Sequence, residues 1–512
     1  MGFKIFEIKL PAGFTPDELG RKIAKKLKSA EFSHTIEKQS LDARDKQNIH
    51  WLLRVGVSSP ALPGPPHREE KLFDIPYKKR NRKVVVVGSG PAGFFCAYTL
   101  VLAGFEVSLL EQGSPVGTRM KCVADFERSG NLDENDNYCF GEGGAGTFSD
   151  GKLTSRTKSI KAERRFIFRS YIEAGAPAEI AYLAHPHLGS DNLVKIVQNL
   201  RGTYLARGGR FLFNTRVRDI VLRNGTVTAV ETDKGKLEAD YVIFATGHSA
   251  YTTYRLLFKR GIPFRVKPFA VGCRVEHPQE LINLSRWGQK NLPGVKAAEY
   301  RLTWKDDAHL SIYSFCMCPG GQVVPAAPYR GLNIVNGKSD YARNRLLANS
   351  GIVAAVDLNK ILKKELEPLQ ALEWLEQLEK KFFDFSGSYA APACRIGDFL
   401  AGKIASSLPA ASYPFSLMPA DFRELLPGEV VMSLQAGMNN FCKQLKGFEK
   451  GIMLGLESKT SSPIQAVRDR TGRSQAADNL YICGEGSGWA GGIVSSAADG
   501  IKAALAIINS LN

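Results

Sequence analysis

Apolar and polar residues alternate differently along three parts of the chain. The first part, residues 1–77, switches between short strand-like runs and helical stretches, with helices expected from Thr15 and over 41–49. The first of these helices has a capping box, in which Thr15 is followed three residues later by Glu18, and Pro16 occupies its first position. We expect a small β-α-β-α-β module that ends in a Pro-rich linker.

The second part begins near residue 83 with four consecutive valines at 84–87. Such a run is typical of a strand that is buried on both faces of a parallel sheet. From about 270 to 440 the chain changes to strand-like pieces followed by a helical stretch at 359–383, where Pro368 is expected to break or begin a helix. Beyond that region the α/β character returns, with one more strand and a final helix.

A glycine loop directly follows the valine strand. Gly88, Gly90 and Gly93 have the G-x-G-x-x-G spacing, and a helix comes next. The following strand ends in Glu111, 18 residues beyond the last of these glycines. Gly88 permits the tight turn, Gly90 lets the backbone approach a pyrophosphate, and Gly93 lets helix and strand pack closely. An acid at position 111 accepts hydrogen bonds from a ribose and repels a 2′-phosphate, so the loop predicts FAD or NAD rather than NADP.

Two later motifs favour FAD. One apolar strand ends in Ala245-Thr246-Gly247, and another ends in Gly484-Glu485 before a helix of small residues. The arrangement resembles the FAD-binding fold of the glutathione-reductase type, although most of that fold class has Asp in place of Glu485. The resemblance implies that this acid holds ribityl or phosphate oxygens. It also implies that the last helix points its N-terminus at the flavin pyrimidine, where the helix dipole stabilises negative charge.

A closer resemblance covers nearly the whole chain after residue 83. Six long stretches are similar to a family of uncharacterised bacterial FAD-dependent dehydrogenases: FGEGGAGTFSDGKL at 140, HPHLGSDNL at 185, KPFAVGCRVEHPQ at 267, FCMCPGGQVVPAA at 315, ESKTSSPI at 457 and CGEGSGWAGGI at 483. The resemblance implies the fold and the cofactor and leaves the substrate open.

The expected fold class is therefore α/β. Its main part is a Rossmann-type FAD-binding domain, discontinuous in sequence and split between residues 78–269 and 441–512. Residues 270–440 would be an inserted α+β substrate domain packed over the flavin, and the small N-terminal α/β module precedes both. Hydride chemistry would belong to the cofactor, while the protein orients the substrate.

A second glycine stretch, GEGGAGTFSDGKL at 141–153, repeats the spacing at Gly141, Gly143 and Gly146. Polar residues precede it, so no buried strand leads into a phosphate loop, and no helical periodicity follows it. We interpret the spacing as a decoy for a phosphate loop. Its glycines are expected to let the backbone lie flat against the isoalloxazine of a single FAD.

Together, the motifs and resemblances predict a set of cofactor-binding residues. They are Gly88, Gly90, Pro91, Ala92, Gly93, Glu111, Gln112, Arg119, Gly143, Gly144, Ala145, Gly146, Thr147, Val217, Ala245, Thr246, Gly247, Gly484, Glu485, Gly491, Gly492 and Ile493.

Three residues are candidates for catalysis beside the flavin. Thr147 and Lys152 would contact the isoalloxazine or the substrate, or they would belong to a polar turn. Lys152 is a candidate donor to flavin N5 or to an anionic substrate. His187 would act as a general acid or base, or as a structural histidine ahead of a helix capped by Ser190 or Asp191.

The nine cysteines are scattered and read as reduced thiols. Cys316 and Cys318 allow a redox interpretation, but a C-x-C disulfide closes a small strained ring. Neither residue lies at a predicted helix N-terminus that would lower a thiol pKa. A packed pair of strand thiols is therefore favoured. No metal-ligand spacing stands out, and we expect no metal site.

The formal net charge is +17, and much of it lies near the N-terminus. Residues 1–83 hold 18 Lys/Arg and 10 Asp/Glu, a balance of +8, with the basic run KKRNRK at 78–83. Such charge attracts nucleic acid or another polyanion, or it belongs to a solvated linker and helix face. The sequence also lacks a secretory signal and a long apolar run, so we expect a cytoplasmic protein with no membrane partner.

These features predict an FAD-dependent oxidoreductase that transfers hydride between an unidentified substrate and flavin N5. Only one complete nucleotide-binding unit is visible, so we expect no dedicated NAD(P)H domain. The electron partner would be transient NAD(P)H, another protein or O₂. A first alternative is a tRNA-modifying flavoprotein that binds nucleic acid through its basic N-terminal module. A second is a non-enzymatic flavin-binding redox sensor. The oligomeric state is left open.

Overall fold

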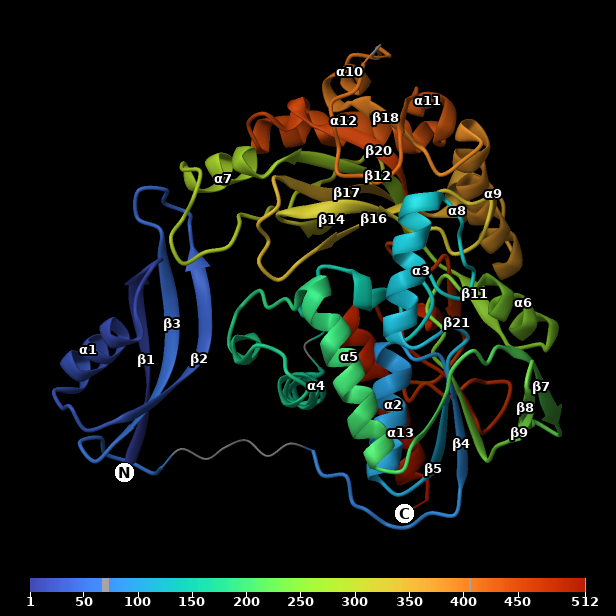
Figure 1. Ribbon diagram of the computed structural model, residues 1–512, viewed down its shortest axis with the longest axis horizontal. Helices are drawn as coiled ribbons and strands as arrows, with labels where there is room; N and C mark the ends of the chain where they lie inside the picture. Colours follow the sequence, from blue (N-terminus) through green and yellow to red (C-terminus); the bar gives the residue numbers. More distant parts are fainter. Residues whose placement is uncertain (67–72, 156, 158, 405–406, 512) are drawn as a thin grey trace.

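The computed structural model describes residues 1–512 except 67–72, 156, 158, 405–406 and 512. Figure 1 shows three parts. The N-terminal module stands beside the main body, with α1 on its outer side, and β2 is the strand nearest the main body. Within the main body, the sheet that contains β4 and β5 lies at one end, and the sheet that contains β12, β14 and β17 lies at the other.

The N-terminal module is one antiparallel sheet and one helix. Its elements are β1 (Gly2–Pro11), α1 (Pro16–Leu27), β2 (Ser33–Asp42) and β3 (His50–Ser59), in the sheet order β1-β3-β2. The predicted capping box of Thr15 and Glu18 is present at the start of α1. Ile8, Leu19 and Ile23 are buried between sheet and helix.

The helix predicted over 41–49 is wrong. Strand β2 runs through Asp42, and turns connect it to β3. The carboxylate of Asp42 accepts a hydrogen bond from the Arg44 N–H, and that of Asp45 accepts one from the Gln47 N–H. Side chains of this kind satisfy nearby backbone groups in turns, which competes with helix formation. The module is therefore β-α-β-β.

The valine run forms the centre of a five-stranded parallel sheet, as predicted. The sheet order is β22 (Leu480–Ile482), β10 (Tyr241–Phe244), β4 (Lys83–Val87), β5 (Glu106–Leu110) and β6 (Arg210–Leu212). Val84 and Val86 belong to one buried cluster, while Val85 and Val87 belong to another on the opposite face. Both faces of the valine run are thus covered, which explains why the run contains no polar residue.

Helices α2 (Pro91–Leu102) and α13 (Ile493–Asn509) pack against each other on one face of this sheet (Figure 1). A Cβ built on Gly500 would lie 2.0 Å from the Ala92 carbonyl oxygen, so glycine permits the close approach. The remaining elements of this part are α3 (Val116–Ser129), η1 (Ala145–Phe148), α4 (Lys161–Glu173), η2 (Ala178–Ala181), α5 (Gly189–Ala206), β7 (Val217–Arg223), β8 (Thr226–Thr232), β9 (Gly235–Glu238), α6 (Tyr251–Lys259), β11 (Phe264–Val266), β21 (Ile464–Ala466) and η4 (Glu485–Ser487).

The inserted part is built on a seven-stranded sheet. Its order is β13 (Thr303–Trp304), β14 (Ile312–Cys318), β17 (Leu347–Val356), β12 (Phe269–Pro278), β20 (Ile452–Glu457), β18 (Ala391–Arg395) and β19 (Leu417–Pro419). Its other elements are α7 (Gln279–Trp287), β15 (Gly321–Pro325), β16 (Val335–Ser339), α8 (Leu358–Ile361), α9 (Pro368–Ser386), α10 (Ile396–Leu400), α11 (Phe422–Leu425), α12 (Gly428–Gln444) and η3 (Phe448–Lys450). Pro368 begins α9, in agreement with the prediction.

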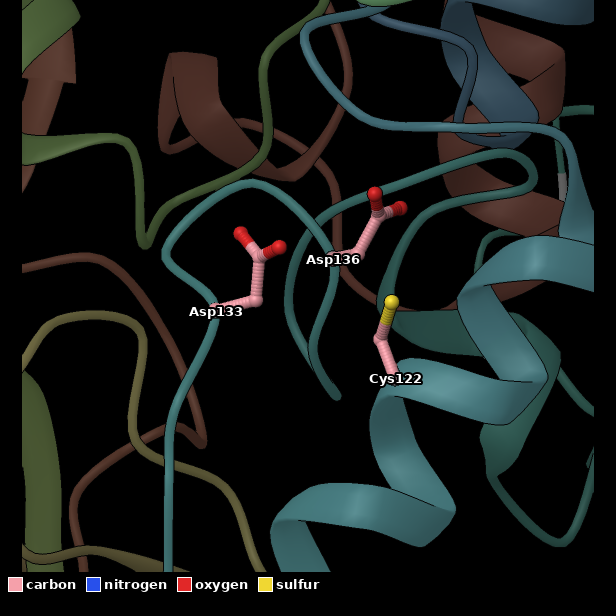
Figure 2. A group of neighbouring side chains, drawn as sticks. All are labelled: Cys122, Asp133 and Asp136. Carbon is pink, nitrogen blue, oxygen red and sulfur yellow. The ribbon is translucent and has the colours of Figure 1, made fainter.

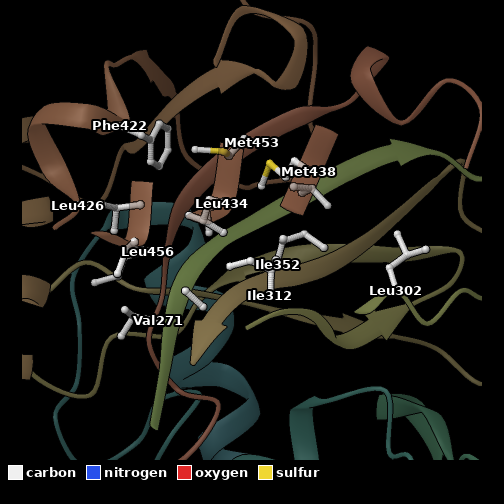
Figure 3. Close-up of a cluster of buried hydrophobic side chains, with 14 of the residues drawn as sticks. Val271, Leu302, Ile312, Ile352, Phe422, Leu426, Leu434, Met438, Met453 and Leu456 are labelled. Atoms are coloured by element: carbon white, nitrogen blue, oxygen red, sulfur yellow. The ribbon is translucent and has the colours of Figure 1, made fainter. Parts of the chain in front are cut away.

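One face of the seven-stranded sheet packs against helices of the same part. Figure 3 shows Val271 of β12 and Ile352 of β17 lying near Leu434 and Met438 of α12. These side chains are fully buried. The predicted domain boundary between 440 and 441 falls within α12, and β20 lies beyond it yet pairs with β12. The inserted sheet therefore extends to Glu457.

Among the described residues, no helix combines the length and the apolar character needed to cross a membrane.

Candidate active site

One large cavity lies between the two sheets and reaches the N-terminal module. Its volume is about 2180 Å³. Small-molecule pockets usually measure roughly 300–1,000 Å³, so this cavity has room for a second ligand beside a dinucleotide. Its walls include both glycine stretches, the N-terminal ends of α2 and α13, strand β14, and residues 38–44 of the module.

The first glycine loop has the local geometry that its sequence predicts. Gly88 has φ +99°, a conformation that favours glycine, and a Cβ there would lie 2.5 Å from the Ala245 carbonyl oxygen. A Cβ on Gly93 would lie 1.8 Å from the Gly88 carbonyl oxygen. At Gly90 the nearest atom to such a Cβ is 3.8 Å away, so this position is open.

Glu111 joins the two glycine stretches. Its Oε2 accepts hydrogen bonds from the N–H and the hydroxyl of Ser89, at 3.1 and 2.7 Å. Its Oε1 accepts from the N–H groups of Gly113 and Gly141, at 3.0 and 3.2 Å. Glu111 is 6% exposed, and it lines the cavity. The predicted contact of Glu111 with a ribose stays a prediction.

The second glycine stretch lies directly on the first. A Cβ on Gly144 would lie 3.0 Å from the Gly90 Cα, so the two backbones meet where neither has a side chain. No strand leads into Gly141, and the glycines are followed by the short turn η1 within the stretch instead of a long helix, as expected for a decoy. Gly144, Ala145 and Gly146 line the cavity. Their expected contact with the isoalloxazine stays a prediction.

Two helix N-termini open into this cavity. Gly90 is the N-cap of α2, and Gly492 is the N-cap of α13. Within the described chain no side chain caps either helix. Their free N–H groups and positive dipole ends therefore favour anionic groups such as phosphates.

Two buried polar side-chain atoms also lie at the cavity without a hydrogen-bond partner in the described chain. Gln112 Nε2 and His248 Nε2 are buried and have no hydrogen-bond partner among the described residues. Both residues line the cavity. Buried polar groups are normally paired, so a ligand with hydrogen-bonding groups fits here. These atoms, the open position at Gly90 and the two helix N-termini suit a dinucleotide such as FAD.

Most residues predicted to bind the cofactor line the cavity, and so do Lys152 and His187. The predicted residues that do not line it, in the described part of the chain, are Gly93, Arg119, Gly143, Thr147 and Gly484.

Arg119 is fully buried beneath the second glycine stretch instead of facing the cofactor site. Its guanidinium donates hydrogen bonds to the carbonyl oxygens of Asn137, Glu142 and Gly144, at 3.0, 2.7 and 2.8 Å. Burial lowers its pKa to about 10. The prediction of a direct cofactor contact is therefore corrected. Arg119 stabilises the loop by binding its carbonyl oxygens and does not line the cavity.

Thr147 also turns out to support this loop. It is 1% exposed, and its hydroxyl donates to the Glu142 carbonyl oxygen at 3.3 Å. A side chain in this position does not reach the cavity, so the predicted contact with flavin or substrate does not fit the geometry.

A buried cluster of charges surrounds Lys152. Arg343 donates two hydrogen bonds to the Asp150 carboxylate, at 3.1 and 2.6 Å, and Lys152 Nζ lies 3.3 Å from the same carboxylate. Burial acts to raise the pKa of Asp150, but Lys152 and Arg343 outweigh burial and lower it. Burial acts to lower the pKa of Lys152, and Asp150 outweighs it and raises that pKa. Lys152 is therefore a fixed cation that also donates to the Met317 carbonyl oxygen.

His187 lies beside this cluster. Its backbone bridges that of Lys152, and its Nε2 lies 3.1 Å from the Tyr341 carbonyl oxygen. Burial, and then the charge of Arg343, lower the pKa of His187 to about 4. The ring is therefore neutral near pH 7. It can accept a proton only from a strong acid, which makes a positioning role more suitable than general base catalysis.

The predicted cap of helix α5 is wrong. Leu188 is its N-cap, and Ser190 and Asp191 lie in its first turn. Ser190 donates to Asp340 at 3.0 Å, while Asp191 accepts from the Tyr341 N–H at 2.8 Å. Both side chains bind the inserted part instead of capping their own helix.

The structure brings several residues to the cavity that the sequence did not single out. Arg343, Lys459 and His248 line it. Lys459 Nζ bonds Glu379 at 2.7 Å, and both side chains are buried. Only His248 carried a local signal, since it directly follows the Ala-Thr-Gly strand end.

One group of potential metal ligands lies outside the cavity. The ligand atoms of Cys122, Asp133 and Asp136 lie within 4.8 Å of one another in the described part of the chain (Figure 2). Asp136 already accepts hydrogen bonds from the N–H and the hydroxyl of Ser114, at 2.8 and 2.5 Å. The carboxylate therefore has a structural partner, and we assign this group no metal.

Comparison with known proteins adds the family. Residues 82–254 match the family described as pyridine nucleotide-disulphide oxidoreductase, and residues 268–460 match the one described as FAD-dependent protein, C-terminal domain-like. A protein of Clostridium beijerinckii, described as an uncharacterized protein, is 36% identical over 538 residues, which cover 99% of each chain.

Solved structures with a similar fold are more distant. CtdE in complex with FAD is 12% identical, with 84% of each chain covered and a TM-score of 0.35. L-proline dehydrogenase from P. horikoshii is 13% identical, with 85% of this chain and 95% of that chain covered and a TM-score of 0.36. Likeness at these TM-scores carries no argument about function.

Fold, cavity and family matches define an α/β flavoprotein of the FAD-dependent oxidoreductase class, and FAD is its cofactor. The chain belongs to the family of FAD-dependent proteins that includes the Clostridium beijerinckii relative.

Proposed function

We propose that the protein is an FAD-dependent dehydrogenase or reductase that transfers hydride between a substrate in the cavity and flavin N5. The observation that carries the proposal is the cavity of about 2180 Å³, which the cofactor loops and the inserted sheet line together. A dinucleotide held by the glycine loops leaves space in it for a second molecule. The proposal includes a glutathione-reductase-type seating of FAD, with the N-terminus of α13 at the pyrimidine end of the flavin.

When bound, FAD supplies the hydride acceptor or donor, and the chain supplies binding and orientation. The open backbone at Gly90 and the uncapped start of α2 receive the pyrophosphate. Lys152, fixed by Asp150, presents a positive charge to the substrate or to the flavin. His187, neutral near pH 7, packs beside this lysine and keeps its backbone in place.

The test is anaerobic absorption spectroscopy of the purified protein. We expect a yellow protein whose flavin band bleaches when a substrate or NAD(P)H delivers a hydride. Glu111→Gln should weaken FAD binding by about 10-fold or more, because each hydrogen bond to a charged group contributes roughly 1.5–3 kcal/mol. A protein that is colourless and has no affinity for added FAD would contradict the proposal.

Electron donors can be separated in the same experiment. NADH, NADPH and pools of metabolites are added in turn, and the rate of bleaching is followed. Bleaching by NAD(P)H alone would indicate a reductase, whereas bleaching by a metabolite would indicate a dehydrogenase. A flavin that no donor reduces at a useful rate would instead favour a redox sensor.

A second candidate function is the modification of a nucleic acid, and a set of exposed cations along the cavity favours it. We define the basic rim as the exposed cations that line the cavity from the N-terminal module and from the inserted part: Lys38, Arg44, Lys46, Arg286, Arg301 and Lys305. Nearby carboxylates are largely paired, since Asp42 bonds Arg44 and Glu299 bonds His185. A rim of this charge suits a phosphate backbone.

RNA binding distinguishes this candidate. Fluorescence anisotropy with a labelled tRNA should give an affinity that falls steeply with salt, and Lys38→Glu with Arg301→Glu should reduce it. Lys25→Glu on the outer helix α1 is the matched control, because Lys25 is exposed but does not line the cavity. Absence of binding at low salt would remove this candidate and leave the small-molecule enzyme.

A further inference from the structure

The thiols of Cys316 and Cys318 lie at an irregular point of strand β14. Pairing with β17 shifts register between Phe315 and Cys318, which marks a β-bulge. At this bulge Cys316 has φ +43°, a left-handed conformation that is rare for residues other than glycine. Such conformations persist only where surrounding contacts impose them, and they cluster at functional sites.

A buried ion pair imposes this conformation. Arg274 and Glu457 form a salt bridge in which both side chains are 0% exposed. The same guanidinium donates a hydrogen bond to the Cys316 carbonyl oxygen at 2.6 Å. Gly337 leaves the space for it, because a Cβ there would lie 2.4 Å from Arg274 Nη2. Three other segments of the chain therefore hold the bulge of β14 in place.

The two thiols differ in access. Cys316 is half-buried and lines the cavity, whereas Cys318 is fully buried and does not line it in the described part of the chain. Cys318 donates to the Cys316 carbonyl oxygen at 3.3 Å, so its sulfur lies close behind the first cysteine. One thiol can meet a molecule in the cavity, whereas the other is closed off from it and lies against Cys316 and the Arg274 guanidinium.

Charge favours the thiolate at the accessible position. Hydrogen bonding with Cys318 lowers the pKa of Cys316, burial opposes this, and the cations Arg274 and Lys152 lower it further. Bonding with Cys316 and burial raise the pKa of Cys318 well above its ordinary value. Asp150 also faces this region, but Arg343 and Lys152 neutralise it. These opposite shifts favour a nucleophilic thiolate at Cys316 and a protonated thiol at Cys318.

We propose that Cys316 and Cys318 are a redox-active dithiol that reacts with low-molecular-weight disulfides entering the cavity. The Cys316 thiolate attacks one sulfur of the external disulfide, whose S–S bond breaks and releases one thiolate. Cys318 then gives its proton to the released thiolate and attacks the Cys316 sulfur, which releases the second half of the disulfide as a thiolate that takes a proton from water. Two electrons pass from the pair to the external disulfide, and the products are an internal disulfide and two thiols.

This exchange needs no flavin and is independent of the proposed hydride transfer. It replaces the interpretation of the pair as strand thiols that only pack. Its product closes the strained C-x-C ring, and thiols readily reduce a disulfide of this kind again. The exchange defines one class of molecule that the cavity admits, namely compounds that carry a disulfide and are small enough to reach Cys316.

The test uses the full-length flavoprotein and glutathione disulfide as the probe. Released glutathione is measured, and the peptide that contains both cysteines is weighed by mass spectrometry. We expect two thiols released per protein, and a peptide lighter by the mass of two hydrogen atoms. Cys318→Ser should stop at the mixed disulfide, with one thiol released and glutathione attached at Cys316. Cys316→Ser should react at least about 10-fold more slowly, because an ordinary thiol is only a few per cent thiolate at pH 7.

Cys442→Ser is the matched control, since Cys442 is half-buried on α12 and lies outside the cavity. It should leave rate and stoichiometry unchanged. Serine at 316 keeps the carbonyl that Arg274 binds, and bound FAD together with circular dichroism reports whether each variant folds. If the wild-type protein forms no internal disulfide, or if Cys316→Ser reacts as fast as the wild type, the proposal is overturned. Either result leaves the flavin assay of the proposed function untouched.

Discussion

At the scale of single residues, buried charged groups near the cofactor site mainly hold backbone in place. Glu111 accepts hydrogen bonds from Ser89, Gly113 and Gly141, and so fixes one glycine stretch against the other. Arg119 does the same from behind by donating to the carbonyl oxygens of the second stretch. Charge buried at such cost is retained where it fixes a geometry that apolar packing cannot specify.

His187 gives a prediction about acid stability. Its pKa is about 4 in the folded chain and 6.5 in an unfolded one, so the unfolded state binds the proton first as the pH falls. Stability that is present above pH 6.5 is therefore lost progressively down to pH 4. Between pH 7.5 and pH 5 the free energy of unfolding should therefore fall by about 2 kcal/mol less in His187→Gln than in the wild type. Urea unfolding at these two pH values measures it.

His277 provides the matched comparison for this experiment. Burial lowers its pKa to about 4 as well, but its ring bonds the Phe448 carbonyl oxygen, away from the cavity. His277→Gln should flatten the pH dependence of stability by a similar amount. If the free energy of unfolding of His187→Gln depends on pH as that of the wild type does, His187 takes up its proton at the same pH in the folded and the unfolded protein.

The sequence predicted the identity of many residues at the cavity but not their contacts. Glu111 and Gln112 were predictable because they follow a strand in a fixed local pattern. Asp150 and Arg343 are 193 residues apart in the sequence, and no local pattern around either residue predicts that their side chains meet in the folded chain. Arg119 and Thr147 were assigned to the cofactor because they lie near glycines, whereas both side chains point into the loop that they support.

At the scale of secondary-structure elements, glycines allow the helices to pack closely against the loops and against each other. α2 and α13 begin at glycine N-caps beside the same cavity, and neither start has a side-chain cap in the described residues. Elements with local signals, such as the strand, turn and helix around Gly88, were predicted correctly. The turns at 43–49 were mistaken for helix because their aspartates bond backbone groups at close range.

Two alanine substitutions in the first glycine loop should have different consequences. Gly93→Ala places a Cβ 1.8 Å from the Gly88 carbonyl oxygen, so it should cost at least about 3 kcal/mol of stability or prevent folding. Gly90→Ala meets nothing closer than 3.8 Å and has an ordinary φ of −64°, so the protein should fold. Its methyl group would occupy the approach of the pyrophosphate and weaken FAD binding by about 10-fold or more.

Thermal unfolding and FAD titration of both variants separate the two effects. Gly20→Ala on α1 is a control, because its added Cβ meets no atom within 4 Å and should be neutral or stabilising. Normal FAD affinity in Gly90→Ala would argue against a pyrophosphate at this loop.

At the scale of the whole molecule, buried polar contacts join parts that are distant in sequence. Glu379 of the inserted part bonds the Tyr251 hydroxyl of α6 at 2.9 Å and Lys459 at 2.7 Å. All three side chains are at most 6% exposed. The inserted sheet is thereby fixed above the cofactor loops, and the cavity between the two sheets has a defined width. The pairing of Lys459 with Tyr251 spans 208 residues, so only the folded chain reveals it.

The N-terminal module contacts the main body through a backbone bridge at the edge of its sheet and through apolar packing of Ala12 and Leu41 against the inserted part. The Gln39 N–H donates to the Tyr182 carbonyl oxygen at 2.9 Å, and the Gln39 carbonyl accepts from the Ala184 N–H at 2.9 Å. Gln39→Pro removes the first of these bonds, because proline has no N–H. The hydrogen bonds within the sheet remain, because β2 is an edge strand and the Gln39 N–H points away from the sheet. We expect the module to fold and FAD to bind as before, while the mouth of the cavity opens.

Hydrogen exchange measures this expectation directly. The amide of Ala184, which donates to the Gln39 carbonyl oxygen, should lose protection in Gln39→Pro by about 10-fold or more, since a net backbone hydrogen bond contributes roughly 0.5–1.5 kcal/mol and neighbouring contacts loosen with it. Gln39→Ala keeps the backbone N–H and should leave protection unchanged. If an anionic ligand contacts basic-rim residues of both the module and the inserted part, its binding depends on the bridge. Ligand affinity should then fall in Gln39→Pro and stay unchanged in Gln39→Ala. Equal affinity in the two variants would mean that the module flanks the cavity without shaping its entrance.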